Sequence, residues 1–319
     1  MIPRSWPAEP PKRSCLGIGS ENLMSLTRHI LYKSDLLEVR HVVCRPGCCR
    51  AGEVEDPETD TLVLPLRGVF VQHVAPGREI LAEPNQALFF AAGRLHRISH
   101  PVTDGDDCLA LEPSPEGWRE ALSAEGLRSS GIGTHGLLSA AAMAARTLLW
   151  QRLVRGLATP LEAEDVSLAL IVTALRTARR EEGKRPGREG TRDLRRQQVE
   201  GARIALLTQP DRKWTLSALA RQVHSSPFHL ARIFRDEVSL PVHQYQQRAR
   251  LARALDLLLE TDRELTEIAL DLGFSSHSHF TAVFRRLVGL SPSAFRRSAG
   301  SREAAEVRNL LIASPTPRR

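Results

Sequence analysis

The sequence predicts a multi-domain protein of mixed α and β structure, with an N-terminal antiparallel β-barrel or sandwich, a helical middle segment and a C-terminal all-α domain of two helix-turn-helix units. Three observations support this prediction. Short apolar runs cut by turn residues occupy positions 36–112, an Ala- and Leu-rich pattern with a helical period follows, and two similar stretches lie about fifty residues apart in the last third. A chain of 319 residues is long enough for two or three separate cores.

The N-terminal region alternates apolar runs with turn residues. LLEVRHVVC, TLVLPLRGVFVQHV and NQALFFAAG are rich in Val, Leu and Phe, and Gly, Pro, Asn or Asp separates such runs at intervals of about ten residues. Evenly spaced short strands are typical of antiparallel barrels and sandwiches. We therefore expect a β-domain over residues 21–115, preceded by a proline-rich segment, residues 1–20, that is disordered.

The middle of the chain has the period of amphipathic helices. The two stretches that show it are SAAAMAARTLLWQRLVRGL and LEAEDVSLALIVTALRTARR. The second is apolar over much of its circumference and therefore needs a packing partner, either the β-domain or the same helices of a second subunit. Residues 116–180 are accordingly expected to support the β-domain or to mediate dimerisation. Three glycines and Pro186 predict a linker over residues 181–194.

The composition argues against export, membrane insertion and catalysis. The N-terminus has no apolar stretch of the length of a secretory signal, and the most apolar run, residues 137–150, contains Arg146 and is too short to span a bilayer. Five cysteines without an export signal are expected to be reduced. The sequence shows no nucleophile–base signature, phosphate-binding glycine loop or suitably spaced pair of carboxylates. We expect a cytoplasmic, non-enzymatic protein without a cofactor.

Positive charge is concentrated near the C-terminus. The formal net charge is +7, and residues 195–297 carry 16 Lys and Arg against 10 Asp and Glu, a net charge of +6. A localised basic surface favours a polyanionic partner such as nucleic acid, although charge alone does not distinguish such a surface from a solvated one. A tail over residues 298–319 contains Pro315 and Pro317 and is expected to be flexible.

The same basic segment contains the repeat. The apolar face of its first helix returns 49 residues later; the two sets are Leu216, Leu219, Ala220, Val223 and Leu265, Ile268, Ala269, Leu272. In each unit a short turn, HSSP or GFSS, leads to a second helix that Ser226 or Ser276 can cap. Two helices joined by a short turn, with an alanine where they cross, form a helix-turn-helix. We predict such units at about 215–237 and 264–288.

A longer helix is predicted between the two units. Pro241 can open it, and it runs through VHQYQQRARLARALDLLLE. Its predicted inward face consists of Tyr245, Ala249, Ala252, Leu255 and Leu259. Nineteen residues at about 1.5 Å each give a rod of about 28 Å. A rod of this order can hold two recognition helices about 34 Å apart, which is one turn of DNA.

Three stretches of the segment carry a family resemblance. LSALARQVHSSPFHLARIFRDEVSLPVHQY, RLARALDLL and IALDLGFSSHSHFTAVFRRLVGLSPSAFRR resemble the DNA-binding domain of the AraC family of transcription regulators. The resemblance covers residues 195–297 and includes the GF turn and the closing GLSPSAF. It implies two helix-turn-helix units on a shared linker helix, with the second helix of each entering the major groove of double-stranded DNA. RNA polymerase is a further partner that such a regulator implies.

The resemblance assigns roles to individual positions. The base-reading positions are Phe228, Ala231, Arg232, His277, Ser278, Thr281 and Ala282. The positions that meet phosphate are Ser226, His229, Arg235, Ser276, His279 and Arg285. Arg232 is the strongest candidate because a guanidinium can bridge O6 and N7 of guanine, whereas the equivalent Ala282 has no donor. The first unit is therefore expected to read sequence more strictly than the second.

Three of these residues have a plain structural alternative. Phe228 can be a packing residue instead of a contact to a thymine methyl group. His229 and His279 can cap or pack within the fold.

The N-terminal region carries a second resemblance. LVLPLRGVFVQHV followed by NQALFFAAGRLHRISHP resembles the cupin-type domain that often precedes this DNA-binding domain. The resemblance implies that the domain binds a small effector or mediates a homodimer, without identifying the effector or its binding residues. Metal-binding cupins resemble one another in a His-x-His pair with a following Glu and a later His. This sequence has His73, His96 and His100 without that pair, so no metal is predicted.

The cysteines leave one alternative open. Cys44, Cys48 and Cys49, in CRPGCC, together with Cys108, can form a zinc or redox thiol site, or can be inert buried cysteines. The alternative function is a cupin-type enzyme, or a thiol- or metal-dependent sensor, in which the C-terminal domain only localises the activity.

Overall fold

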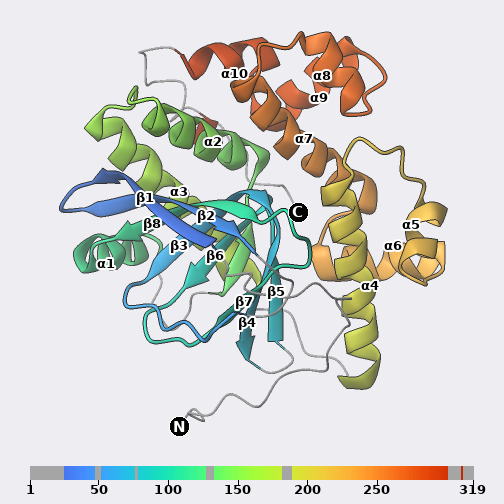
Figure 1. The fold of residues 1–319 in the computed structure, drawn as a ribbon, viewed down its shortest axis with the longest axis horizontal. Helices are drawn as coiled ribbons and strands as arrows, with labels where there is room; N and C mark the ends of the chain where they lie inside the picture. The colour runs from blue at the N-terminus through green and yellow to red at the C-terminus, as the bar shows by residue number, and fades with distance from the viewer. Residues whose placement is uncertain are drawn as a thin grey trace.

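The computed structural model describes residues 25–46, 52–75, 78–126, 133–181, 189–300 and 310–311. The N-terminal segment expected to be disordered and most of the expected flexible tail lie outside these residues. Figure 1 shows a β-region on which the helices of the middle segment lie, with the C-terminal helices along the top and the right of the view. The described chain is therefore β at its start and α from its middle onward, as the sequence predicts.

The β-region consists of two antiparallel sheets. In sheet order, the larger contains β1 (Ser25–Lys33), β2 (Leu37–Arg45), β8 (Asp106–Pro113), β3 (Thr61–Gly68), β6 (Gln86–Phe90) and β9 (His135–Leu137). The smaller contains β5 (Arg78–Ala82), β4 (Phe70–Ala75) and β7 (Arg97–Ser99). Among the described residues neither sheet closes on itself, so the predicted antiparallel pairing is confirmed and the predicted cupin-like barrel is not.

Alternation along β6 explains why this strand is buried on both faces. Leu88 and Phe90 point into an apolar cluster between the two sheets, which also contains Phe70 and Ile80. Ala87 and Phe89 point to the opposite face and join the core formed with the helices. Successive side chains of a strand point to opposite sides, so β6 faces an apolar layer on each side.

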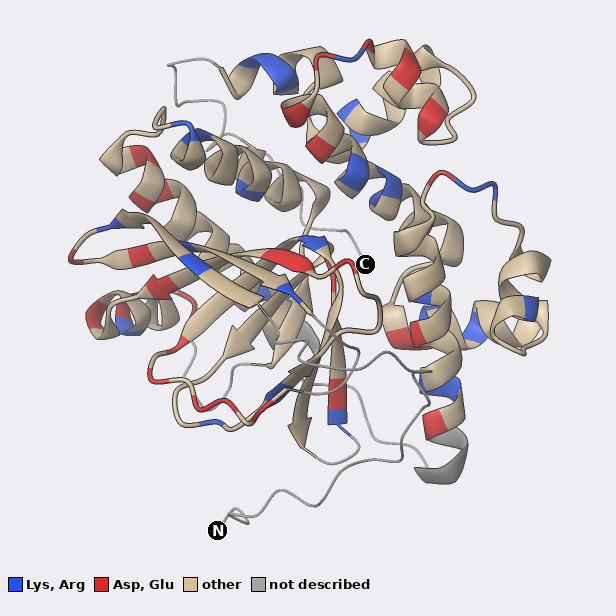
Figure 2. Ribbon diagram, viewed as in Figure 1, with Lys and Arg blue, Asp and Glu red and all other residues tan. Residues whose placement is uncertain are grey.

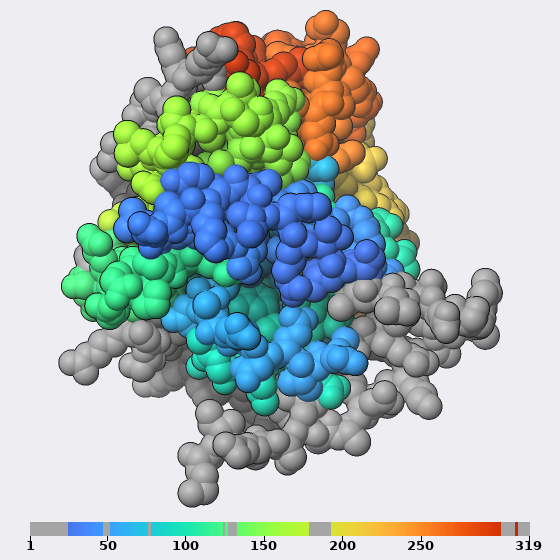
Figure 3. Space-filling view, turned by 60° about the vertical axis from the view of Figure 1, so that its left-hand side comes forward, coloured from blue at the N-terminus to red at the C-terminus, as the bar shows by residue number. Residues whose placement is uncertain are grey.

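Three helices and a short strand form the described part of the middle segment. They are α1 (Pro115–Ala124), β9, α2 (Ala140–Val154) and α3 (Pro160–Glu181). β9 was not predicted, because three residues are too few to show an alternating pattern. The residues of α2 are buried all around from Ala140 to Arg152, so this helix is enclosed by the rest of the chain. Figure 3 shows the light green atoms of α2 directly above the dark blue strands β1 and β2.

Buried arginines connect α2 to its surroundings. Arg146 donates hydrogen bonds to the carbonyl oxygens of Pro65 and, at 2.9 Å, Pro84. Arg152 forms an ion pair with Glu162 at the start of α3, with a separation of 2.6 Å. The middle helices thus pack within the chain, on the sheet and on the C-terminal helices.

The C-terminal part is all helical. Its helices are α4 (Glu189–Thr208), α5 (Leu216–Gln222), α6 (Pro227–Val238), α7 (Val242–Glu260), α8 (Leu265–Asp271), α9 (His277–Val288) and α10 (Pro292–Ser298). α4 begins inside the stretch expected to be a linker, and good helix formers dominate it from Leu194 onward. α7 follows Pro241 as predicted, and its predicted inward face, Tyr245 to Leu259, is buried.

The apolar residues of the helices belong to two cores. The first helix-turn-helix unit has its own core with α4, and this core ends at Tyr245 on α7. The second unit, together with α7 from Leu251 onward, shares one continuous core with α2, α3 and the large sheet. Figure 1 shows α7 running diagonally from the first unit to the second. No helix of the described chain is long and apolar enough to cross a membrane.

Candidate nucleic-acid interface and an internal cavity

The first unit is a capped helix-turn-helix. The Thr215 hydroxyl accepts a hydrogen bond from the Ala218 N–H and caps α5. His224, in the turn, has a φ of 51°, which lies in the left-handed region. The Ser226 hydroxyl accepts from the His229 N–H at 3.2 Å and caps α6. The predicted serine cap is confirmed, and it fixes the residue at which the exposed second helix begins.

The second unit repeats this backbone. Gly273, 49 residues after His224, has a φ of 74°, and the Ser276 hydroxyl accepts from the His279 N–H at 3.1 Å. The ends of the second helices match as well, because Ser239 and Gly289 both have a left-handed φ, 61° and 95°. The repeat read from apolar side chains is therefore also a repeat of caps and turns.

The buried faces of both units agree with the repeat. In the first unit Leu219 and Ala220 are fully buried, and in the second Ile268 and Ala269 are fully buried. Leu216 and Leu265, which start α5 and α8, are less buried: Leu216 is 37% exposed and Leu265 is half-buried, because the first turn of each short helix lies at the edge of its core. The alanines allow the close helix crossing that the motif requires.

The predicted base-reading residues of α6 lie on one outward face. Phe228, Ala231 and Arg232 are spaced three and four residues apart and therefore share a helix face. Phe228 is 91% exposed, Arg232 is exposed, and Ala231 is half-buried. The exposure of Phe228 contradicts its alternative interpretation as a packing residue within the chain.

The predicted base-reading residues of α9 have a comparable arrangement. His277, Ser278 and Ala282 are exposed, and Thr281 is half-buried. His277 Nε2 lies 3.4 Å from Thr281 Oγ1, one helical turn away. This face offers imidazole and hydroxyl groups but no guanidinium, whereas the matching face of α6 offers Arg232.

The predicted phosphate-contacting residues divide into two kinds. Arg235 and Arg285 lie exposed in the last turns of α6 and α9, and Figure 2 shows further Lys and Arg along α7 and the first unit. His279 has structural contacts instead: its Nδ1 lies 2.9 Å from Ser275 Oγ, and its ring meets Phe274 edge-on at 5.7 Å. The side chain of His279 is nonetheless exposed, so it is held within the fold and is also accessible from outside.

Sequence reasoning missed Arg250, which joins the two units. This α7 residue donates from Nε to the Pro210 carbonyl oxygen at 2.8 Å, ahead of the first unit, and from Nη1 to the Gly273 carbonyl oxygen at 3.1 Å, in the turn of the second. Burial lowers its pKa. An arginine within a helix gives no sequence signal that separates such a role from solvated charge.

Polar contacts also fix the C-terminal helices against the β-region. Glu83, which is fully buried, accepts a hydrogen bond from the Tyr245 hydroxyl and pairs with Arg203 at 3.0 Å. Arg67 on β3 pairs with Asp256, at 3.3 Å, and with Glu260 on α7. The helix that links the two units is therefore in direct contact with the sheets.

A cavity of about 580 Å³ lies between the two sheets. Its walls combine apolar residues with charged ones, including Arg28, Arg40 and Glu112. His96 and His100 line it as well, whereas His73 lies outside the lining and contacts Ser99 Oγ at 2.7 Å. The three histidines therefore do not converge on one site.

The pKa values of the two lining histidines shift in opposite directions. Burial lowers the pKa of His96. Burial is the largest single influence on His100 and acts to lower its pKa, but hydrogen bonds and charge interactions with Asp106 and Cys44 together outweigh burial and raise the value to about 9. Of the sequence-predicted cysteines, Cys44 and Cys108 are buried free thiols, and Cys48 and Cys49 lie outside the described residues.

Comparisons with known proteins agree with the geometry of the two units. A family model described as "Helix-turn-helix domain" matches residues 219–298. An uncharacterised HTH-type transcriptional regulator of Haemophilus influenzae is 32% identical over 105 residues, which cover 33% of this chain and 35% of the relative. The probable transcription factor PqrA of Proteus vulgaris is 34% identical over 83 residues, which cover 26% of this chain and 68% of PqrA.

A solved structure is also similar. A probable AraC family transcriptional regulator from Rhodopseudomonas palustris is 25% identical and covers 32% of this chain and 96% of its own, with a TM-score of 0.30. Several curated relatives match over only a third to a half of their own length.

Two capped helix-turn-helix units, the matching family model and relatives named as transcriptional regulators identify a DNA-binding helix-turn-helix domain of the kind found in regulators of transcription. The chain belongs to the AraC family.

Proposed function

We propose that the chain binds double-stranded DNA sequence-specifically by placing α6 and α9 in two successive major grooves. The observation that carries this proposal is the matched exposure of the two second helices, each capped by a serine and each presenting polar side chains outward from a buried apolar face. α7 has 19 residues, and at about 1.5 Å each its length of about 28 Å is close to one DNA turn. One chain can therefore reach both grooves without a second subunit.

The two units divide the work of recognition. Arg232 reads a guanine through two hydrogen bonds, and Phe228 contacts a thymine methyl group from its exposed position. Ala231 completes this face of α6. The α9 face, with His277, Ser278, Thr281 and Ala282, contributes weaker base contacts because it has no bidentate donor.

Phosphate contacts set the register on the duplex. Arg235 and Arg285 contribute guanidinium groups, and the capping hydroxyls of Ser226 and Ser276 lie at helix starts, where anions bind. His229 and His279 lie three residues after these serines, and their imidazole groups are further proposed phosphate contacts. Because these contacts are to the DNA backbone, they strengthen binding to every DNA sequence alike.

The cavity between the sheets is the proposed effector site. Its volume of about 580 Å³ is within the range of small-molecule pockets, and its lining combines apolar walls with a few charged groups. An effector acts by binding one arrangement of the sheets and α7 more tightly than another. Contact with RNA polymerase, formation of a homodimer through the middle helices and residence in the cytoplasm are part of the same proposal.

The test is selection of bound fragments from genomic DNA by the full-length protein, with affinities compared across salt concentrations. The expected result is one enriched motif with two conserved blocks about one turn apart. Arg232→Ala is expected to relax preference at one base and to lose about 1–3 kcal/mol there, whereas Arg285→Ala weakens binding to all sequences and reduces the salt slope by about 1. Unselective, salt-sensitive binding by the wild type would refute the proposal.

A further inference from the structure

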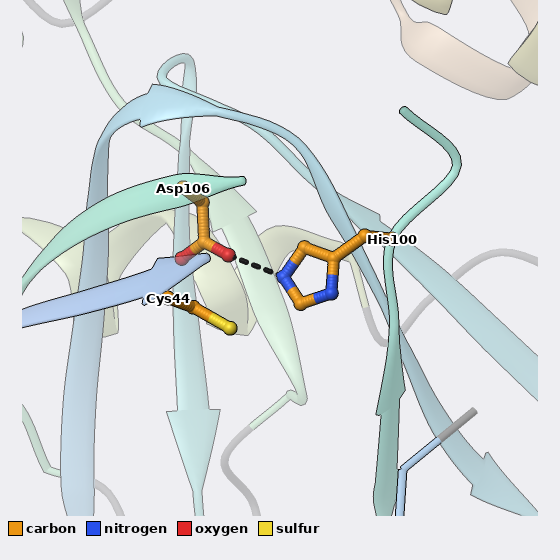
Figure 4. Close-up of side chains that lie close together, drawn as sticks. All are labelled: Cys44, His100 and Asp106. Carbon is orange, nitrogen blue, oxygen red and sulfur yellow. Dashed lines mark hydrogen bonds and ion pairs between the residues drawn. The ribbon is translucent and has the colours of Figure 1, made fainter. Parts of the chain in front are cut away.

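A thiol, an imidazole and a carboxylate meet at one end of the cavity. Cys44, His100 and Asp106 each offer one ligand atom, and these atoms lie within 4.8 Å of one another (Figure 4). His100 Nε2 is 2.6 Å from Asp106 Oδ1. The three residues are 5%, 1% and 6% exposed, and all three line the cavity. Three different metal-binding groups are thus buried, yet they line a cavity from which a small ion can reach them.

The two sheets build this cluster together. Cys44 and Asp106 lie directly opposite each other where β2 pairs with β8. His100 follows β7 and approaches from the smaller sheet. Gly105 has a φ of 75°, and a Cβ atom on it would lie 2.1 Å from the Cys44 carbonyl oxygen, so the backbones are tightly packed here. The positions of Cys44 and Asp106 are therefore set by strand pairing, and His100 is the residue directly after the end of β7.

We propose that Cys44, His100 and Asp106 bind a divalent cation of the Zn²⁺ class. Thiolate, imidazole and carboxylate are the ligands that Zn²⁺ uses, and softness disfavours Mg²⁺ and Ca²⁺ at a thiolate. Metal–ligand bonds of about 2.0–2.3 Å in a tetrahedron place ligand atoms about 3.3–3.8 Å apart, which small shifts of these side chains provide. The cation takes the place of the hydrogen bond between His100 and Asp106.

The surroundings suit such a site. Three protein ligands leave the fourth tetrahedral position to water or to a small molecule from the cavity. The Cys108 thiol donates a hydrogen bond to Asp106 Oδ2 at 3.1 Å and orients the carboxylate. Metal ligands are commonly oriented in this way by hydrogen bonds from neighbouring residues. This site differs from the cysteine-rich CRPGCC site considered from the sequence, because it needs neither Cys48 nor Cys49.

The site is placed to act on the linker helix. Asp106 also lines a second cavity, of about 470 Å³, whose opposite wall is α7 with Arg253 and Asp256. Asp106 lies opposite Gly68 of β3 in the sheet. The neighbouring residue, Arg67, forms the ion pair with Asp256 of α7. Metal binding that moves Asp106 thus changes the strand that holds α7. This regulatory consequence rests on the proposed function, whereas metal binding itself does not.

The first test is Co²⁺ titration of the chelator-treated, full-length protein. The expected result is one equivalent of bound Co²⁺ with thiolate-to-metal charge-transfer absorption and the intense visible bands of tetrahedral coordination, both displaced by Zn²⁺. Cys44→Ser should abolish the charge-transfer band, and His100→Gln and Asp106→Asn should weaken Co²⁺ binding roughly tenfold or more. No charge-transfer band in the wild type, or a band that survives Cys44→Ser, would overturn the site.

Controls separate this site from other thiols and from misfolding. His96→Gln changes another buried imidazole that lines the cavity, and the double variant Cys48→Ser, Cys49→Ser removes the two other thiols of CRPGCC. Both are expected to keep the Co²⁺ spectrum, and its loss in the double variant would overturn the assignment. Thermal unfolding supplies a second readout: Zn²⁺ should raise the Tm of the wild type but not of the three ligand variants.

DNA binding supplies the regulatory test. The probe is the motif selected by the wild type, and its Kd is measured with Zn²⁺ and with chelator. We expect a change of about 5–150-fold, the usual range of coupling between sites, which Asp106→Asn removes. Equal Kd values with stoichiometric Zn²⁺ bound would overturn the coupling to α7 but leave the metal site intact. Zn²⁺ binding without any selected motif would instead mark failure of the proposed DNA function.

Discussion

Removing the Glu83 carboxylate should destabilise the junction between the β-region and the first helix-turn-helix unit. Glu83 is fully buried beside the β-turn that precedes β6, where it accepts from the Tyr245 hydroxyl and pairs with Arg203 at 3.0 Å. Burial, which is the largest influence on it, raises the pKa of Glu83, and Arg203 opposes that shift. Glu83→Ala leaves the mostly buried guanidinium of Arg203 and the buried hydroxyl of Tyr245 without the carboxylate that they contact.

The expected loss in the free energy of unfolding depends on the contacts that Arg203 and Tyr245 keep. Breaking a buried ion pair by removing one member costs about 3–5 kcal/mol, because the other charge stays buried. Arg203 keeps its hydrogen bond to the Leu81 carbonyl oxygen at 3.1 Å, which favours the lower end of this range. We therefore expect Glu83→Ala to lower the free energy of unfolding by about 3 kcal/mol.

Urea unfolding of the full-length protein measures this loss. Glu53→Ala is the matched control, since Glu53 is exposed in the same β-region and should change the free energy by less than about 0.5 kcal/mol. A double-mutant cycle with Tyr245→Phe isolates the Glu83–Tyr245 contact, and a coupling of about 0.5–3 kcal/mol is expected. If Glu83→Ala cost no more than Glu53→Ala, or if the cycle were additive, the junction would not depend on this contact.

Three further outcomes are expected. Arg152→Ala leaves Glu162 buried without its partner and should cost about 3–5 kcal/mol in urea unfolding, whereas a loss below 1 kcal/mol would mean that water replaces the guanidinium. Phe228→Ala, at a side chain that is 91% exposed, should change stability by less than about 0.5 kcal/mol yet weaken binding to the selected DNA; unchanged DNA affinity would remove Phe228 from the interface. Burial holds the pKa of His96 below its ordinary value of 6.5, so the folded state binds fewer protons than the unfolded state, and stability should fall as pH drops below about 6.5. His96→Gln should reduce this slope between pH 7.5 and 5.5, and an unchanged slope would assign it to other groups.

The sequence was most informative where structure is local. The helix-turn-helix faces, the serine caps and the inward face of α7 follow from spacings of three to five residues, and each was predicted. β9 is too short to show a pattern, and the helical start of α4 was hidden by neighbouring glycines and Pro186.

Contacts between distant residues were beyond a single sequence. The meeting of Cys44 with Asp106 depends on the exact register between β2 and β8, and a shift of one residue would turn these side chains to opposite faces. From the sequence, His100 was noted only as a histidine outside the His-x-His pair that metal-binding cupins share. Likewise, the spacing of arginines along α7 does not show that Arg250 reaches the turn of the second unit at Gly273.

The division of the helices between two apolar cores has an evolutionary consequence. The first unit encloses a core of its own with α4. Recombination can therefore replace this unit together with α4, provided that the new segment keeps a few polar contacts such as that of Arg203 with Glu83. The second unit shares its core with α2 and the large sheet, and a foreign copy would have to match both. Inheritance of new DNA specificities should therefore proceed by replacement in the first unit and by point substitution on the outer face of α9 in the second.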